Sequence, residues 1–579
     1  MRRRALTPIL LCALAGCARS VIPNLAAGEG AGAALRAHSG AVVWVASQAY
    51  KVRPADPAQP KRNEASIAAA RAETVAFQIV VSAKGSLNGV DVAFSDFSDG
   101  SGHVISAASS VEAFREFYLD LTHPSGAAGR IGEWPDGLVP IGKDPYYHEQ
   151  RNGAPFAVPA GKNQAVWVDV AVPANAIAAT YRAVATVAAG RATLAKVPVT
   201  LTVWNFTLPT TSSLATAFGL DTWGTYLGHY GNHWNTKKIE QLTNLYQAEA
   251  LKHRISLYDN DVAGPAYAYD QKTGKITYID YSLFDATYVP DLSGSLLPSH
   301  AQGTVAEFPD GQVSPPGPTP GPADAQYVAY WKDVAAHFRA ENWLGRNFYY
   351  DLDEPHTAQD YQTVRHRADV AHKADPRIRV MDTTSFKREL VGRINIWTPI
   401  VNELDSPGFP PPSVYTARQK AGDTVWFYTS NESLSSGGPW PNFFVDAGVN
   451  DARIFSWMAW RYGLNGFLYY ATTLNYTRTP DPWTNVYNFG DNGDGVLFYP
   501  GRTSLIGGRH DIPCPSIRLK SVRAALQDYE YMVLLHAKGQ DAFVNALVRK
   551  LVTKTNIWTQ DGAALEKARA EMAAKIQGT

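Results

Sequence analysis

The sequence predicts two folded parts, an amino-terminal β-sandwich and a (β/α)8-type barrel with closing carboxyl-terminal helices. Short strand-like runs separated by Gly, Asn, Ser and Pro clusters fill residues 41–207, a spacing typical of a sandwich. From residue 208 to 540, strands alternate with helical segments, which favours a barrel built on a parallel sheet. A helical segment, residues 541–579, ends the chain, whose 579 residues suffice for two or three domains.

Residues 1–16 have the pattern of a lipoprotein signal peptide. Three arginines, residues 2–4, precede an apolar run that is too short to span a bilayer. The run ends in Leu-Ala-Gly-Cys, residues 14–17, which resembles a bacterial lipobox, so we expect lipidation of Cys17. An ordinary cleavable signal with a chance cysteine is the alternative. Either pattern predicts export, and the lipobox predicts an anchor on a bacterial membrane, facing the periplasm or the cell surface, with 17–40 as a tether.

The charge balance, the hydropathy and the cysteine content bear on nucleic-acid binding, membrane contact and disulfide formation. The chain has 53 basic and 53 acidic residues, which gives no electrostatic footprint for nucleic acid. No later stretch is long and apolar enough to cross a bilayer, so the lipid anchor is the one membrane contact expected. Cys514 has no remaining partner, so we expect no disulfide. The sequence does not indicate an oligomeric state.

The elements follow from local pattern. Strands are expected in the sandwich at 42–45, 74–81, 112–121, 165–170 and 197–204, with a long polar loop at 136–159. Strands are expected in the barrel at 214–220, 254–258, 348–350, 378–382, 394–397, 424–428 and 466–470. Helices are expected at 237–252, 325–340, 357–373, 447–462, 518–537 and 561–576. Residues 303–323, dense in Pro and Gly, are expected to form a surface excursion.

The candidate site lies at the end of the aromatic strand 348–350. Pro355 separates this strand from the next helix, steers Glu354 away from the helical region and itself suits the first helical position. Asp353 and Glu354 therefore lie at the carboxyl edge of the sheet, where ligands bind in α/β proteins. A bland alternative is that one of them only caps the helix. With Asp351, three carboxylates fall within four positions of an apolar strand, which favours function because their burial is costly.

Several runs, taken in order, resemble the catalytic domain of glycoside hydrolase family 123, also known as domain of unknown function 4091. Residues 71–78 resemble its usual amino-terminal partner, and the match covers nearly the whole mature chain. The runs in the catalytic part are 252–255, 353–355, 463–470, 493–501, 516–519 and 528–531.

The resemblance implies a β-N-acetylgalactosaminidase-like enzyme that acts on a glycan by substrate-assisted, retaining catalysis. It places the role of general acid on Glu354 and that of acetamido-orienting carboxylate on Asp353. Cleavage needs a proton on the departing oxygen, and in this variant the sugar's own acetamido oxygen attacks the anomeric carbon. Asp351 is expected to support Asp353, although a solvated surface role is equally compatible with the sequence. No cofactor is implied.

Substrate contacts are expected from residues near predicted strand ends. An aromatic side chain there can stack on a pyranose ring or hydrogen-bond the acetamido group, although core packing is the bland alternative for each. Asp382 at a strand end is expected to bind sugar hydroxyls. The aromatic candidates are Trp397 and Tyr428, which are favoured, with Trp426, Trp457, Tyr469 and Tyr470.

No metal is expected. Residues 491–495, Asp-Asn-Gly-Asp-Gly, resemble a calcium loop but lack the closing glutamate of an EF-hand, so a turn with positive φ explains them equally well. His229 and His233 lack an acid or cysteine companion nearby and are expected to be loop residues.

Two other functions remain open from the sequence. A glycosidase acting on a sugar without the acetamido group needs a second carboxylate across the pocket, for which Asp382, Glu403 and Asp405 are candidates. The other is a glycan-binding lipoprotein without turnover, which has no need of a protonated acid.

Overall fold

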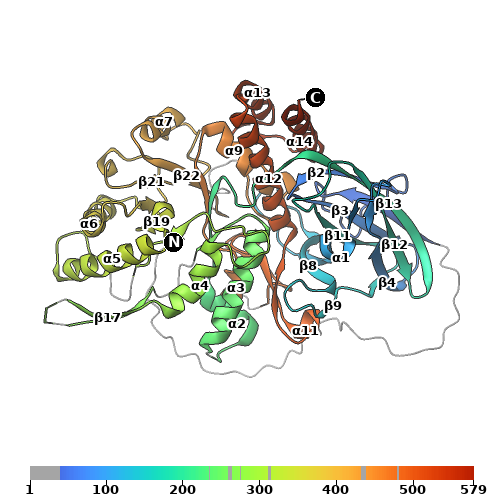
Figure 1. The fold of residues 1–579 in the computed structure, drawn as a ribbon, viewed down its shortest axis with the longest axis horizontal. Helices are drawn as coiled ribbons and strands as arrows, with labels where there is room; N and C mark the ends of the chain where they lie inside the picture. Colours follow the sequence, from blue (N-terminus) through green and yellow to red (C-terminus); the bar gives the residue numbers. More distant parts are fainter. Residues whose placement is uncertain are drawn as a thin grey trace. The chain divides into compact units, whose positions relative to one another are not determined.

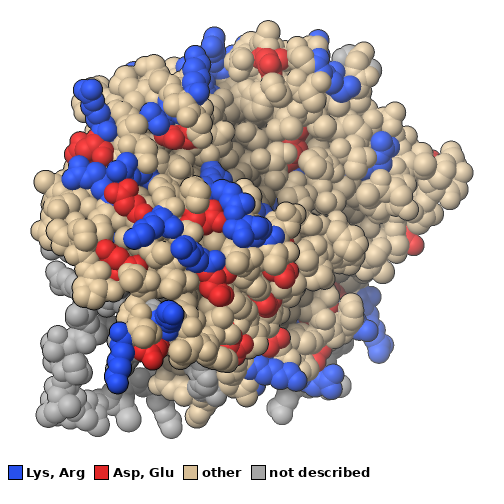
Figure 2. Space-filling view, turned by 60° about the vertical axis from the view of Figure 1, so that its left-hand side comes forward, with Lys and Arg blue, Asp and Glu red and all other residues tan. Residues whose placement is uncertain are grey.

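The computed structural model describes residues 40–578, except 234, 259–263, 271, 274, 311–314, 432–438 and 479–480. The signal peptide, Cys17 and the tether lie outside the described residues. Within the described ranges, every helix is too short or too polar to span a bilayer. On the face drawn in Figure 2, basic and acidic side chains are interspersed, in keeping with the chain's balanced charge.

The amino-terminal part is a β-sandwich, as predicted. Alternating apolar residues of two sheets, among them Phe77, Val90 and Val199, form one buried core between them. The first sheet has the order β1 (Ala41–Ser47), β3 (Thr74–Ala83), β11 (Lys162–Ala171), β7 (Val111–Leu121), β8 (Gly132–Lys143) and β9 (Gln150–Asn152). The second has the order β10 (Phe156–Val158), β4 (Leu87–Phe94), β12 (Thr180–Ala189), β13 (Ala192–Thr207) and β2 (Ala65–Arg71). β5 (Phe97–Ser98) also pairs with β12, β6 (Val104–Ile105) pairs with β5, and α1 (Ala107–Ser110) precedes β7.

The second part is a nearly closed barrel of parallel strands, which confirms the predicted fold class. Each strand pairs with the next along the chain except at one gap, and β23 pairs back with β14. The strands are β14 (Ala215–Gly219), β15 (Leu257–Tyr258), β18 (Ala306–Glu307), β19 (Asn347–Tyr350), β20 (Val380–Asp382), β21 (Ile396–Trp397), β22 (Thr424–Tyr428) and β23 (Gly466–Tyr469).

Helices cover the outside of the barrel, and α12 lies between the barrel and the sandwich (Figure 1). The barrel helices are α2 (Thr222–Tyr230), α3 (Thr236–Lys252), α4 (Ser282–Ser293), α5 (Pro322–Ala340), η1 (Leu344–Arg346), α6 (Ala358–Ala374), η2 (Arg388–Leu390), α7 (Pro412–Lys420), α8 (Val449–Arg453), α9 (Phe455–Tyr462), α10 (Asn475–Arg478) and α11 (Thr503–Ile506). The closing helices are α12 (Ile517–Ala537), α13 (Asp541–Leu551) and α14 (Gly562–Gln577). Four hairpins complete the described chain: β16 (Ala266–Tyr269) with β17 (Ile276–Asp280), β24 (Tyr487–Asn488) with β25 (Asp491–Asn492), β26 (Phe498–Gly501) with β27 (Ile512–Pro515), and β28 (Val552–Lys554) with β29 (Ile557–Trp558).

Three sequence expectations about elements were wrong. The predicted loop 136–159 begins inside β8 and contains two further strands, because β8 is rich in Pro and Gly and hides its alternation. The predicted excursion 303–323 contains the third barrel strand, β18, a two-residue strand too short to give a periodic signal. The predicted helix 447–462 is divided at Ile454 into α8 and α9.

Side chains alternate between the barrel interior and the helical shell, and this alternation sorts the candidate residues. Phe348, Met381 and Trp426 fill the interior in one apolar cluster, together with Leu468. Their neighbours point the other way; Tyr349, for example, packs into the cluster of α4, α5 and α6. Residues two positions beyond the interior layer are therefore directed toward the carboxyl mouth of the barrel.

Hydroxyl groups bridge the gap between β15 and β18. Thr304 Oγ1 lies 2.9 Å from Ser256 Oγ and accepts the Thr216 N–H at 3.1 Å. The Thr304 N–H in turn donates to Ser256 Oγ at 2.6 Å. Two side chains, those of Ser256 and Thr304, thus replace the backbone ladder at the seam of the barrel.

We expect Thr304→Val to lower the free energy of unfolding by ~1–3 kcal/mol, because it leaves the buried Thr216 N–H without its acceptor. Urea denaturation monitored by tryptophan fluorescence measures the change. Thr363→Val is the matched control, since that hydroxyl donates to the Gln359 carbonyl one turn away on α6. Equal stability of the two variants would contradict a role for the hydroxyl seam in closing the barrel.

Candidate active site

Asp353 and Glu354 lie in the bend after β19, before α6 begins. The cap of α6 is Thr357, whose hydroxyl accepts the Asp360 N–H at 3.1 Å while the Asp360 carboxylate accepts the Thr357 N–H at 2.9 Å. A capping role for Asp353 or Glu354 is therefore excluded. Pro355 was expected at the first helical position, but the helix begins only at Ala358, because the Thr357–Asp360 pair sets the start.

Two hydroxyl groups orient the carboxylate of Asp353. The Tyr350 hydroxyl donates to Asp353 Oδ1 at 2.7 Å, and the Thr383 hydroxyl donates to the same oxygen at 3.1 Å. Asp353 is exposed, whereas its two donors are partly or fully buried. Two hydroxyl groups thus hold one carboxylate oxygen of an exposed side chain.

Glu354 is fixed through both its side chain and its backbone. The Tyr428 hydroxyl, from the end of β22, donates to Glu354 Oε1 at 2.5 Å. The Glu354 N–H donates to Thr383 Oγ1 at 2.9 Å, and the Glu354 carbonyl lies 2.8 Å from His356 Nδ1. Its φ is +48°, a region that a residue with a side chain adopts rarely and at a cost of ~1–3 kcal/mol. Contacts from two other strands hold the residue in this conformation, as expected of a functional site.

Two further carboxyl groups near the ends of β19 and β20, those of Asp351 and Asp382, are buried. Asp351 Oδ1 accepts from the Tyr349 hydroxyl and from Arg367 Nη1, both at 3.2 Å. Burial raises the pKa of Asp351 to about 7, although Arg367 opposes this shift. Asp382 is fully buried, and its Oδ1 accepts the Leu352 N–H at 3.0 Å. Burial, with the nearby charge of Asp351, raises the pKa of Asp382 well above its usual range.

These contacts correct two expectations. A solvated surface role for Asp351 is wrong, because the residue is buried and paired with Arg367. Asp382 does not meet the expectation of a sugar-hydroxyl ligand, because no part of it is exposed.

The aromatic candidates divide according to strand alternation. Tyr428 contacts Glu354, as described above. Trp397 follows Ile396, which fills the interior, so its ring packs outside the barrel and its Nε1 donates to Asp423 at 2.8 Å. Trp457 is buried among the closing helices, and its Nε1 donates to Asp528 at 3.1 Å. Tyr469 is also fully buried, and its hydroxyl donates to Asp494 at 2.9 Å. Trp397, Trp457 and Tyr469 are therefore core residues in this structure.

Sequence reasoning missed Tyr350 and Thr383, which contact the candidate acids directly. Each lies two residues after a side chain that fills the barrel interior, Tyr350 after Phe348 and Thr383 after Met381, and this spacing was the available signal. Burial raises the pKa of Tyr350 above its usual range, so this hydroxyl keeps its proton and acts as a donor.

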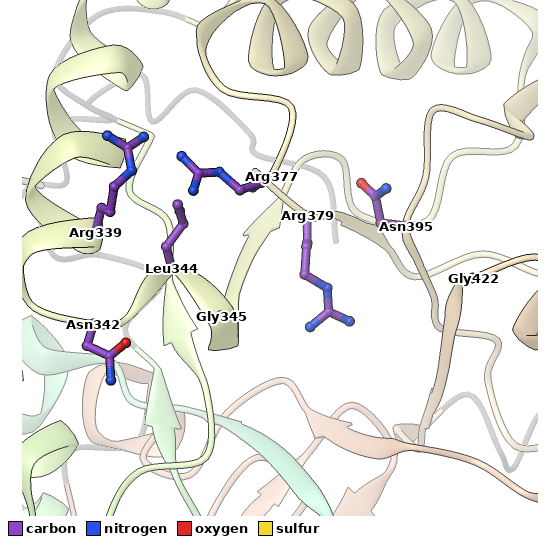
Figure 3. Close-up of a pocket in the computed structure, with 8 residues that line it drawn as sticks. All are labelled: Arg339, Asn342, Leu344, Gly345, Arg377, Arg379, Asn395 and Gly422. Carbon is purple, nitrogen blue, oxygen red and sulfur yellow. The ribbon is translucent and has the colours of Figure 1, made fainter.

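The described cavities open at the opposite end of the barrel. One of about 550 Å³ is lined at the amino ends of β19–β22 by Arg339, Asn342, Leu344, Gly345, Arg377, Arg379, Asn395 and Gly422 (Figure 3). A second of about 380 Å³ shares Gly345 and Arg379 with it. In barrel enzymes the chemistry lies at the carboxyl ends of the strands, so we do not assign these cavities to catalysis.

No group of three His, Cys, Asp or Glu side chains in the described ranges is arranged to hold a metal ion. The 491–495 segment is a turn in which Gly493 and Gly495 have φ of +99° and +73°. His229 was expected in a loop but lies in α2, where its ring contacts Asp511 Oδ2 at 3.1 Å and the Tyr246 hydroxyl at 2.9 Å.

The chain was compared with known proteins. Residues 321–535 match the model of the glycoside hydrolase 123 catalytic domain, and residues 45–189 match that of the glycoside hydrolase 123 N-terminal domain. No curated protein sequence matches the chain.

Among solved structures, a family 123 glycoside hydrolase from Clostridium perfringens, described in terms of glycolipid glycan hydrolysis, matches with a TM-score of 0.72 at 14% identity, covering 93% of this chain and 99% of that one. Two others are more distant. A family 5 xyloglucanase from Bacteroides ovatus has a TM-score of 0.30 at 10% identity and covers 81% of this chain and 99% of its own. A family 39 glycoside hydrolase from Bacteroides cellulosilyticus has 0.31 at 11%, covering 76% and 80%.

The Clostridium structure supports the fold, and the two family models identify the protein. Their ranges follow the family's domain order and together span more than half of the chain. The protein therefore carries the catalytic and N-terminal domains of glycoside hydrolase family 123 and is a glycosidase.

Proposed function

We propose that this glycosidase cleaves glycans at a 2-acetamido sugar, in the manner of a β-N-acetylgalactosaminidase, by substrate-assisted retaining catalysis. The observation that carries the proposal is the placement of two adjacent carboxylates at the end of β19, held by hydroxyl groups of three strands. An adjacent pair on one bend reaches the same sugar unit from one side. That arrangement suits a reaction in which the second nucleophile comes from the substrate.

In the first step, Glu354 gives its proton to the glycosidic oxygen as the bond to the anomeric carbon breaks. Asp353 accepts the acetamido N–H and turns the acetamido oxygen toward the anomeric carbon, where that oxygen forms the new bond of an oxazolinium ion. The negative charge of Asp353 stabilises this cation. In the second step, Glu354 takes a proton from water, which attacks the same carbon and restores the acetamido group with retained configuration.

The support for these roles is geometric. Asp353 is exposed on its outer side and anchored by Tyr350 and Thr383, as an orienting residue needs to be. Glu354 is half-buried, and Tyr428 occupies one of its carboxyl oxygens. The other oxygen can exchange a proton with a sugar or with water. The contacts of Glu354 with Thr383 and Tyr428 maintain its strained backbone and with it the relation of the two side chains.

A glycosidase that uses a second enzyme carboxylate is the alternative, and Glu403 favours it most among the three candidates. Glu403 is half-buried, and the Ser385 hydroxyl beyond β20 donates to its Oε2 at 2.5 Å. Asp382 is fully enclosed, and Asp405 is bound by the Tyr462 hydroxyl at the end of α9 at 2.7 Å. A non-catalytic glycan binder, the other alternative that the sequence leaves open, does not agree with the match to the catalytic-domain model.

We expect release of 4-nitrophenol from 4-nitrophenyl glycosides that carry a 2-acetamido group and none from those with a 2-hydroxyl group. Glu354→Gln is expected to lower kcat by ~10²–10⁴-fold, because it removes the proton donor. Glu403→Gln is the matched control and is expected to retain activity. Turnover of 2-hydroxyl substrates that depends on Glu403 would favour the alternative mechanism, and binding of glycans without turnover would favour the binder.

We also propose that Asp351 supports Asp353 as a neutral, buried carboxyl group behind the exposed pair. The pKa of about 7 for Asp351 exceeds that of an unfolded aspartate, so folding favours the protonated form. Its contribution to stability is therefore fully present below about pH 4 and is lost as the pH rises through about 7.

The free energy of unfolding is consequently expected to fall between pH 5 and pH 8, and Asp351→Asn should reduce this fall by ~1–3 kcal/mol, because asparagine stays neutral. Urea denaturation at both pH values measures the effect. Asp369→Asn, which removes an exposed carboxylate paired with Arg393 on the surface of α6, is the control for loss of a carboxylate. An unchanged pH dependence in Asp351→Asn would show that Asp351 is ionised throughout.

We further propose that the protein is exported and lipid-anchored through Cys17, on the pattern of its first residues. Expressed in a bacterium that processes lipoproteins, the protein is expected in the membrane fraction, and Cys17→Ala is expected to release it or leave it unprocessed. Cys514→Ala is the control and should remain in the membrane fraction. Mass spectrometry of the amino-terminal peptide detects the lipid, and an unmodified Cys17 would rule out the anchor.

A further inference from the structure

The sandwich contacts the carboxyl end of the barrel through the turn 491–495. Asp136 in β8 is fully buried, and its carboxylate accepts from Arg518 Nε at 2.9 Å, from Arg518 Nη2 at 2.6 Å and from the Tyr499 hydroxyl at 2.6 Å. Arg518, in the first turn of α12, uses its remaining amino group Nη1 to donate to the carbonyls of Gly493 and Phe443, each at 2.7 Å. The carboxylate of Asp136 in the sandwich thus orients Arg518, whose Nη1 binds the backbone of the turn.

A second brace from the sandwich holds the adjacent residue of the turn. The Asn492 N–H donates to Ser125 Oγ at 2.8 Å, and Asn492 Nδ2 donates to the His123 carbonyl at 2.8 Å. Ser125 is itself fixed by two hydrogen bonds to Asp446, at 2.5 and 2.8 Å. Asn492 is therefore bound by residues of the sandwich, and Gly493 by Arg518, which Asp136 of the sandwich orients.

The turn is shaped for these contacts. Gly493 has a φ of +99°, and a Cβ there would lie 2.9 Å from Arg518 Nη1. Gly495 has a φ of +73°, and a Cβ there would lie 2.9 Å from the Tyr470 hydroxyl. Glycine is thus needed on both sides of Asp494, once for the arginine and once for the tyrosine.

Asp494 carries the connection to the ends of two barrel strands. Its Oδ1 accepts from the Tyr469 hydroxyl, and its Oδ2 accepts from the Tyr470 hydroxyl and from the Asn431 N–H, all at 2.9 Å. Tyr469 ends β23 and Tyr470 follows it, and Asn431 lies three residues beyond Tyr428, which ends β22. Asp494 therefore ties together the carboxyl ends of β22 and β23. One of these strands supplies the hydroxyl that holds Glu354.

We propose that Asp136 and Asp494 are positioning residues for hydrolysis, an inference that rests on the proposed role of Glu354. The sandwich fixes the turn 491–495, the turn fixes the end of β22, and Tyr428 then holds Glu354 where a glycosidic oxygen can take its proton. The N-terminal domain thereby contributes to the geometry of the active site. A displacement of ~1 Å at a catalytic group can cost ~100-fold in rate, so a remote brace has a measurable effect.

The chain contains a matched control for this inference. Asp169 in β11 is also a buried sandwich carboxylate that pairs with α12, accepting from Lys520 Nζ and Arg523 Nη1 at 2.8 Å. Its partners lie on the same helix as Arg518 but donate nothing to the turn 491–495 in the contacts described. Asp169→Asn therefore weakens the same domain contact without touching the path to Glu354.

The experiment compares Asp136→Asn with Asp169→Asn in the full-length protein. With 4-nitrophenyl N-acetyl-β-D-galactosaminide as the probe, Asp136→Asn is expected to lower kcat at least about tenfold with a smaller change in KM. Asp169→Asn is expected to keep kcat within about twofold of the wild type, even where its loss of stability is larger. Amide hydrogen exchange at Asn431 and Asp494 is the second readout and is expected to speed up in Asp136→Asn alone.

Equal kcat and equal exchange at Asn431 in the two variants would overturn the inference. Should Asp136→Asn fail to fold, two other variants test the brace. Tyr499→Phe removes one hydrogen bond to Asp136, and Ser125→Ala removes the hydroxyl that accepts from Asn492 and donates to Asp446. Each is expected to shift kcat and exchange in the same direction. If the wild type does not cleave the probe, the inference is tested by amide exchange at Asn431, compared between Asp136→Asn and Asp169→Asn. A Glu354→Gln variant as active as the wild type would instead refute the proposed function, so the two failures are distinct.

Discussion

The hydroxyl group of Thr383 is the contact on which the geometry of the site depends. It donates to the Asp353 carboxylate, accepts the Glu354 N–H and lies 3.2 Å from the Tyr350 hydroxyl. One small group from the end of β20 thereby fixes both adjacent acids of β19. The positive φ of Glu354 is tolerable only because its N–H finds this acceptor while its carboxylate finds Tyr428. Without the Thr383 hydroxyl, we expect the backbone of Glu354 to relax to the extended conformation that is usual before a proline.

Much of the fold could be predicted because long elements carry strong periodic signals. The helices at 237–252 and 518–537 and the sandwich strands at 74–81 and 112–121 were found within a few residues of their ends. The barrel strand β18 could not be found, since two residues show no period and their pairing partner, β19, is distant in sequence. Its place in the barrel follows only from the closure of the whole sheet.

In the candidate site too, the residues with a local sequence signal were predicted and the others were not. Asp353 and Glu354 were found because a run of acids after an aromatic strand is a local feature. Trp397 and Tyr469 were misplaced because position at a strand end does not tell which face a side chain takes. A one-residue difference reverses the face, as Ile396 and Trp397 demonstrate. Tyr350 and Thr383 required the register of neighbouring strands, which only the three-dimensional structure supplies.

The barrel is least regular on one side and most regular where the site lies. Hydroxyl groups replace the ladder between β15 and β18, whereas β19 to β23 form an unbroken run of paired parallel strands. The described hydroxyls that hold Asp353 and Glu354 come from residues at the ends of strands in this run or one position beyond them. Buried ion pairs such as Asp136–Arg518 add little net stability, because desolvation offsets their attraction. We infer that the role of this pair at the β22–β23 end of the run lies in the geometry it imposes there. The paired strands give the acids a stiff support, and the sandwich contacts the turn that binds the β22 and β23 ends of this support.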